Sequence, residues 1–273
     1  MIQDIAPHTF DNAFQKILPS PESYILSFRG KEALSQYKND QICCPRAKEL
    51  DLDLSQAIYL FSIDQDPYFL VMHVPEQNHY TYHELRPLTR SEPHHFGFAY
   101  ATGFHLYDWY RNRRFCGRCG KALIPSQTER ALVCPACGVI EYPRIFPAVI
   151  IALTHQDQIL LAQYPGRSKQ VLLAGFVEIG ETLEETVARE VYEEVGLHVK
   201  NIRYYKSQPW GIVSDVLAGF YCELDHDGPI RLDTHELQTA YWISRADLRY
   251  GKENLDGSLT SEMIYRFKIN DYR

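Results

Sequence analysis

The chain has 273 residues with 45% hydrophobic content, enough for packed cores in about two domains. Its formal net charge of −7 argues against a dedicated nucleic-acid-binding protein, which would usually carry a basic surface. It has no apolar run of about eighteen residues, and its N-terminus, MIQDIAPHTFDNAF, lacks a basic segment followed by an apolar one, so we expect a cytoplasmic protein without a transmembrane helix or signal peptide.

The first predicted region, residues 1–113, mixes strands with one helix. Apolar runs at residues 23–28, 57–63 and 67–74 are typical of strands. Residues 94–112 are rich in aromatic side chains and predict a helix, which we expect to serve packing because no catalytic cluster accompanies it. We therefore predict an N-terminal α+β domain.

The second region, residues 114–143, carries four cysteines in two C-x-x-C pairs. Fourteen residues separate the pairs, one fewer than the usual zinc-ribbon range, and a glycine directly follows each pair. Two such turns bring four thiolates to one point, and four protein ligands leave no open coordination position. We therefore predict a structural Zn²⁺ site. Its ligands are Cys116, Cys119, Cys134 and Cys137.

The remaining cysteines are Cys43, Cys44 and Cys222. A reducing cytosol disfavours disulfides, and none of the three belongs to a paired motif. We expect all three to serve ordinary packing.

The third region, residues 144–273, alternates apolar runs with helical segments. Strands with interposed helices predict a mixed sheet flanked by helices. A closing helix is expected over residues 261–269. The expected strands cover residues 148–153, 159–163, 171–177, 216–224 and 240–243.

A helix is predicted from Thr182 to the residue before Gly196. Thr182 and Glu185 have the spacing of a capping box, and glycine fits the left-handed position that ends a helix. Apolar residues recur every fourth position and form a stripe that can pack on a sheet. The stripe consists of Leu183, Val187, Val191 and Val195.

Beside this stripe lie three carboxylates, Glu190, Glu193 and Glu194, within one helical turn. They repel one another, and the negative end of the helix dipole adds to the repulsion. Arg189 supplies one counter-charge, and divalent cations would supply the rest. Ligands that are all oxygen favour hard cations such as Mg²⁺ or Mn²⁺.

The whole segment resembles the Nudix box. Gly175, five residues, Glu181, seven residues and then Arg189-Glu-Val-Tyr-Glu-Glu-Val-Gly-Leu197 match it at every defining position. The resemblance implies an α/β/α sandwich whose helix presents metal ligands, and substrates that are nucleoside diphosphates linked to a variable group. A zinc ribbon before the box, together with Ser207-Gln-Pro-Trp210 after it, is similar to the NADH pyrophosphatase family.

This resemblance implies a metal site and a catalytic group. Glu190, Glu193 and Glu194 resemble the catalytic, cation-binding glutamates, of which we expect Glu194 to be the key one, as metal ligand or as base. Ala174 would offer its backbone carbonyl, and Glu236 resembles an additional metal-binding glutamate. We expect Glu178 and Glu181 to have structural roles.

The resemblance also implies substrate contacts. Trp210 and Phe176 offer flat faces for a base, although Trp210 could instead be a core residue. Many members of the family have a serine where this chain has Asp215, and we expect the carboxylate to alter recognition of a base or a phosphate. The implied contacts are Glu129, Tyr142, Phe176, Gln208, Pro209, Trp210, Gly211, Ile212, Val213, Ser214 and Asp215.

The expected reaction is hydrolysis of the pyrophosphate bond of NAD(H), which gives AMP and nicotinamide mononucleotide. Removal of an NAD cap from RNA and hydrolysis of ADP-ribose or another nucleoside-diphosphate derivative are alternatives. Arginines at positions 111, 113, 114 and 118 could contact RNA phosphates or form an ordinary solvated surface. A binding module that senses a nucleotide is the non-enzymatic alternative. The resemblance implies a homodimer with sites near its interface.

Overall fold

A computed structural model describes residues 1–38, 41–166 and 168–272. The chain forms two compact units. One contains residues 2–145 and 210–214, so the zinc-ribbon segment clusters with the N-terminal region. The other contains Met1 and residues 146–209 and 215–273.

The first unit is built on two small sheets. One sheet has the order β1-β6-β7-β2, and in the other β4 pairs with β3, β5 and β8. The run predicted as one strand at residues 23–28 is divided between both sheets. The strands are β1 (Phe10–Asp11), β2 (Tyr24–Leu26), β3 (Phe28–Arg29), β4 (Glu32–Lys38), β5 (Gln41–Cys43), β6 (Ile58–Ile63), β7 (Asp66–Leu70) and β8 (Thr81–Glu84).

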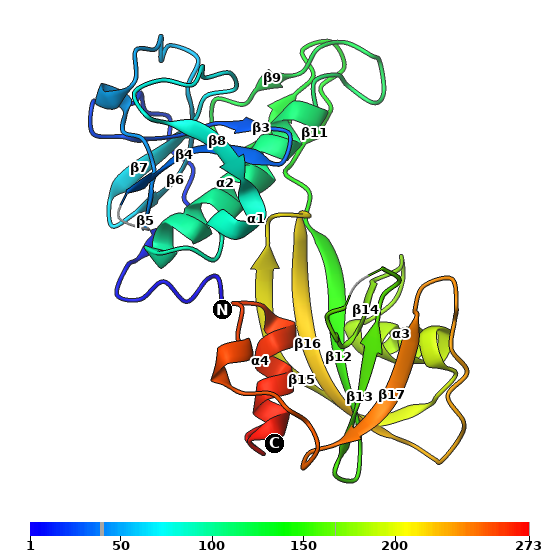
Figure 1. The fold of residues 1–273 in the computed structure, drawn as a ribbon. Coiled ribbons are helices and arrows are strands. Elements are labelled where there is room, and N and C mark those ends of the chain that lie inside the picture. Colours follow the sequence, from blue (N-terminus) through cyan, green and yellow to red (C-terminus); the bar gives the residue numbers. More distant parts are fainter. Residues whose placement is uncertain (39–40, 167, 273) are drawn as a thin grey trace. The chain divides into compact units, whose positions relative to one another are not determined.

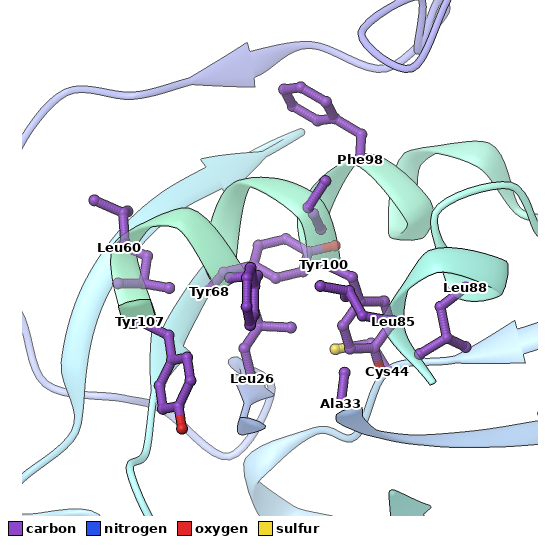
Figure 2. Close-up of a cluster of buried hydrophobic side chains, with 14 of the residues drawn as sticks. Leu26, Ala33, Cys44, Leu60, Tyr68, Leu85, Leu88, Phe98, Tyr100 and Tyr107 are labelled. Carbon is purple, nitrogen blue, oxygen red and sulfur yellow. The ribbon is translucent and has the colours of Figure 1, made fainter. Parts of the chain in front are cut away.

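Helix α2 (His94–Asn112) follows the short α1 (Leu85–Leu88), and its prediction over residues 94–112 is confirmed. A short 3-10 helix covers Ala47–Glu49. The aromatic residues of α2 are buried against both sheets, and Tyr100 donates its hydroxyl hydrogen to the Leu34 carbonyl at 2.8 Å. Figure 2 shows Phe98, Tyr100 and Tyr107 among aliphatic side chains of this core. The expected packing role of the helix is confirmed.

The cysteine-rich segment forms a sheet of three two-residue strands with the order β11-β10-β9. These strands are β9 (Ile124–Pro125), β10 (Leu132–Val133) and β11 (Ile140–Glu141). Such short strands contribute little core of their own, so the segment depends on other interactions for its shape.

The second unit contains a six-stranded mixed sheet with the order β15-β16-β12-β13-β17, in which β14 pairs with β12. Strands β12 and β16 run parallel, while β14 and β13 are antiparallel to β12. The strands are β12 (Phe146–His155), β13 (Gln158–Gln163), β14 (Leu173–Phe176), β15 (Val199–Trp210), β16 (Asp215–Leu224) and β17 (Thr239–Ser244).

Helices cover the two faces of this sheet (Figure 1). Val187, Val191 and Val195 of α3 (Leu183–Val195) pack with one set of sheet residues. Helix α4 (Leu259–Lys268) packs Met263 and Phe267 with the other set. The predicted mixed sheet and the α/β/α sandwich are therefore confirmed. A 3-10 helix at Lys252–Asn254 precedes α4.

Two of the cysteines outside the ribbon, Cys44 and Cys222, are buried, and Cys43 is half-buried. Burial raises the pKa of the Cys44 and Cys222 thiols far above the ordinary value, so both stay neutral and pack as small apolar groups. Within the described ranges, none of the helices combines the length and the apolar character needed to cross a membrane.

Candidate functional site

The four ribbon cysteines converge as the sequence predicted. Their sulfur atoms all lie within 4.8 Å of one another. Each C-x-x-C turn closes in the same way, with an N–H of the following glycine donating to the first cysteine's carbonyl at 2.9 Å. Those glycines, Gly120 and Gly138, both have a φ of +71°, which other residues rarely adopt. The cluster is a closed thiolate site of the kind that holds structural zinc.

Helix α3 begins and ends as predicted. The Thr182 hydroxyl accepts a hydrogen bond from the Glu185 N–H at 3.2 Å, and the Glu185 carboxylate accepts one from the Thr182 N–H at 2.8 Å. Gly196 ends the helix with a φ of +69°. These caps fix the helix register and with it the positions of the glutamates.

Glu190 lies directly against the backbone of β14. A Cβ atom built on Gly175 would come within 1.9–2.3 Å of the Glu190 carboxyl group. Only glycine leaves this space open, so Gly175 allows the helix carboxylate to approach the strand. Burial raises the pKa of Glu190, while Arg189 counteracts this shift.

Glu194 is the most deeply buried acid of the helix, with 2% of its surface exposed. Its Oε2 atom has no hydrogen-bond partner. Burial, with contributions from Glu190 and Glu236, raises the pKa of Glu194 to about 8, although the Ala174 backbone favours the charged form. A buried carboxylate without a counter-charge is costly, so this position suits a group that a cation would complete.

Arg189 organises the acidic residues on the exposed side. Its guanidinium contacts Glu181 at 2.6 Å, Glu190 at 2.7 Å and Glu193 at 2.8 Å. It also donates to the Phe176 carbonyl at 2.8 Å, which ties α3 to the end of β14. The pairing with Arg189 lowers the pKa of Glu181 to about 2, in keeping with a structural role for Glu181. Arg189 is thus the predicted counter-charge.

A loop after β16 brings further acids to the end of α3. The Asp233 N–H donates to the Glu194 carbonyl at 2.9 Å, and the Arg231 N–H donates to the Val195 carbonyl at 2.8 Å. This contact places Glu236 close enough to raise the pKa of both Glu190 and Glu194. Asp233 also raises the pKa of Glu194. Sequence reasoning missed Asp233, although it stands only three residues before Glu236.

The donor set therefore fits a hard divalent cation. It combines the buried Glu190 and Glu194 with the nearby Glu236, and the backbone of Ala174 lies beside Glu194. Glu193 is exposed and pairs with Arg189. In the described part of the chain, the four cysteines are the only group with three or more ligand atoms within 4.8 Å of one another. The carboxylates lie further apart, because without a cation they repel one another.

Two predicted substrate residues lie together on the ribbon. The Tyr142 hydroxyl donates to the Glu129 carboxylate at 3.2 Å, and the Tyr142 ring is 52% exposed. Phe176, at the end of β14, is 55% exposed. These rings present open faces on which a planar base could stack.

The predicted run from Gln208 to Asp215 is divided between the two units. Gln208 is fully buried, and its amide donates to the Gly257 carbonyl and accepts from the Leu259 N–H, so it holds the start of α4. Pro209 and Val213 are exposed, Ser214 is half-buried, and Gly211, Ile212 and Asp215 are buried.

The tip of this run packs in the N-terminal unit. Ile212 belongs to the core formed with α2, and the half-buried Trp210 packs against that core. A Cβ atom built on Gly211 would lie 2.3 Å from the Ala101 carbonyl oxygen, so glycine is needed for the close approach to α2.

Known protein families and individual proteins resemble this chain. Residues 144–263 match the model of the NUDIX domain, and residues 111–142 match that of the NADH pyrophosphatase zinc ribbon domain. A protein of Salmonella typhimurium named NAD-capped RNA hydrolase NudC is 39% identical over 204 residues, which cover 74% of this chain and 77% of the relative.

The chain belongs to the NADH pyrophosphatase family of Nudix hydrolases. An Enterobacter protein, also named NAD-capped RNA hydrolase NudC, is 47% identical over 148 residues, which cover 54% of this chain and 57% of that protein. Several curated relatives are thus matched over less than two thirds of their length. A solved NUDIX hydrolase from Nitrosomonas europaea is 25% identical, with a TM-score of 0.50 over 57% of this chain and 91% of that structure.

Proposed function

We propose that this protein hydrolyses the pyrophosphate bond of NAD(H)-like dinucleotides. A water oxygen bonds to one phosphorus, the bridging P–O bond breaks, and the products are AMP and nicotinamide mononucleotide. The observation that carries the proposal is the buried Glu194, whose Oε2 atom has no partner, beside Glu190 and Glu236 in a family whose relatives are named for NAD caps. The residue roles below are part of this proposal.

Glu194 is the key carboxylate, because its free Oε2 atom can hold a cation or accept the proton of the attacking water. Glu190, Glu236 and the Ala174 carbonyl would hold the cation together with Glu194, and Glu193 would hold a second ion. When bound, Mg²⁺ or Mn²⁺ supplies positive charge that offsets the charge of the pyrophosphate oxygens and the glutamates. Arg189 keeps the helix carboxylates in place between turnovers.

The base of the substrate stacks on an open aromatic face. Phe176 in one unit and Tyr142 in the other each offer an exposed ring, and the hydrogen bond from Tyr142 restrains Glu129 beside it. Gln208 acts indirectly, because both ends of its amide hold the start of α4. We include residues 209–215 among the proposed substrate contacts.

Product analysis tests this function. Purified protein with Mg²⁺ or Mn²⁺ is incubated with NADH, NAD⁺, ADP-ribose and NAD-capped RNA, and the products are separated. AMP together with nicotinamide mononucleotide from the free dinucleotides supports the proposal. Binding of the nucleotides without any cleavage would favour the nucleotide-sensing module instead.

Removal of an NAD cap from RNA is the second candidate, and it is favoured by the names of the relatives. It requires the same bond cleavage on a larger substrate. Arg114 and Arg118 are exposed on the ribbon, whereas Arg111 is paired with Asp108 at 3.1 Å. Cap removal that exceeds NAD⁺ hydrolysis in kcat/KM would make RNA the preferred substrate.

The domain division and the assembly belong to the same proposal. We assign residues 1–113 to an N-terminal α+β domain, 114–143 to a zinc ribbon and 144–273 to the hydrolase domain. We also propose a cytoplasmic homodimer. Its support is an apolar ribbon stripe, in which Ile124 and Ile140 flank Val133 on one face and are 51% and 47% exposed.

A further inference from the structure

Asp215, the first residue of β16, is a buried carboxylate without a counter-charge. Only 7% of its surface is exposed, and its Oδ1 atom has no hydrogen-bond partner. Burial raises its pKa to about 6, and no neighbouring charged group contributes to this shift. Asp215 is therefore still ionised at neutral pH. Burying this charge costs free energy, and no counter-charge in its own unit compensates for it.

The sheet register places Asp215 on the same face as two exposed aromatic rings. In the sheet, Asp215 of β16 is paired with Phe146 of β12. Two residues further along β12, Ala148 is paired with Leu217 of β16 on one side and with Phe176 of β14 on the other. Paired residues share a face, as do residues two apart in a strand. Phe146 and Phe176 are 45% and 55% exposed, so flat apolar surface lies open beside a buried negative charge.

This combination suits one chemical form of the proposed substrate. A nicotinamide ring is flat in both redox states, but only the oxidised ring carries a positive charge. Stacking serves both forms, whereas a fixed carboxylate attracts the cation alone. A phosphate group would be repelled at the same position.

We infer that Asp215 is a specificity-determining residue that favours dinucleotides with an oxidised, positively charged nicotinamide over reduced ones. This inference rests on the proposed function and adds the redox state of its substrate. A free NAD⁺ and an NAD cap on RNA carry the same cationic ring, so both are favoured over NADH.

The test compares the wild type with Asp215→Asn, which keeps the shape and removes the charge, and with Asp215→Ser. Asp227→Asn is the matched control, because Asp227 is 86% exposed and lies beyond the far end of β16. Without added metal, the affinity for NADH is measured from the fluorescence of NADH, and the affinity for NAD⁺ is measured from its competition with NADH. Kinetics with Mg²⁺ then follow NAD⁺, NADH and ADP-ribose.

Both Asp215 variants should lower the affinity for NAD⁺ relative to NADH about tenfold, or roughly 1.4 kcal/mol. The kinetic effect should fall on KM more than on kcat, because this charge contact exists before and during bond cleavage. Use of ADP-ribose, which lacks nicotinamide, should change little, and the control should behave as the wild type.

If the affinity for NAD⁺ relative to NADH is the same in Asp215→Asn as in the wild type, the inference is overturned while the proposed function stays intact. An equal loss on all three substrates together with a lower Tm would also overturn it and make Asp215 a structural residue. If the wild type cleaves neither dinucleotide, the proposed function itself fails, and the inference fails with it.

Discussion

Glu194 combines deep burial with an acidic oxygen that no protein group satisfies. Glu194→Gln keeps the shape and removes the charge, so turnover should fall at least about 100-fold while the fold survives. Activity at saturating Mg²⁺ and Mn²⁺, with a melting curve, measures both effects. Glu184→Gln is the control, because Glu184 is exposed in the first turn of the same helix. Near-normal turnover in Glu194→Gln would rule out the assigned role.

Trp210 has a different kind of environment, because its half-buried ring packs against the core formed with α2. Trp210→Ala should lower the free energy of unfolding by about 2 kcal/mol, which is roughly half of the loss for a fully buried tryptophan. The melting temperature should fall by a few degrees, and hydrolysis of NADH and ADP-ribose should fall to a similar extent. A selective loss on NADH at unchanged Tm would instead show that the indole stacks on the second base.

At the scale of elements, the contact between β14 and α3 depends on one missing side chain. Gly175→Ala would place a Cβ atom within 2.3 Å of the Glu190 carboxyl group, so the helix or the carboxylate must move. Because small displacements of reacting groups strongly reduce the reaction rate, activity should fall at least about tenfold. Gly228→Ala is the matched control, since its Cβ would meet only Leu197 at 3.8 Å. Equal activity of the two variants would contradict this account.

The ribbon is an element that its own strands cannot stabilise, since each has only two residues. Metal analysis should find one zinc per chain, lost in the double variant Cys116→Ser, Cys119→Ser. Proteolysis of the variant should then begin within residues 114–143. A metal-free variant with an intact, protease-resistant ribbon would refute the structural role of zinc.

Helix α3 could be predicted fully because its determinants are local. Its capping box, apolar stripe and terminal glycine all lie within fifteen residues. Strand β15 was not predicted, although it is twelve residues long. It lies at the edge of the sheet, and Lys200, Arg203 and Lys206 interrupt its apolar pattern, so the signal of a buried strand is absent.

The site residues on helix α3 could be predicted from the sequence. Those that depend on contacts between residues far apart in the sequence could not. Gln208 is engaged by residues about fifty positions away, which no local pattern reveals. Asp233 reaches Glu194 through a backbone bond between a loop and a helix end. The burial of Asp215 likewise results from the tertiary fold and not from its neighbours in sequence.

In the whole molecule, the exposed apolar ribbon stripe is one feature that a single chain leaves unexplained. Ile124, Val133 and Ile140 share one face of the three-stranded sheet, and further exposed rings at Phe115 and Tyr142 belong to the same segment. Solvent-exposed apolar residues that are contiguous in a sheet usually mark an interface. A second copy of the chain is the partner expected from the proposed homodimer.

Ile140→Lys places a charge at one side of this stripe and should convert the proposed dimer into a monomer, because burying an unpaired ammonium group costs several kcal/mol. Sedimentation at a series of concentrations measures the mass. Ile179→Lys is the matched control, since Ile179 is fully exposed in the loop before α3 and should leave the mass unchanged. A wild type that is monomeric at all concentrations, or an Ile140→Lys variant that stays dimeric, would place the interface elsewhere or remove it. If the monomeric variant also loses hydrolysis while it retains its zinc and its melting temperature, the partner copy contributes to the substrate site.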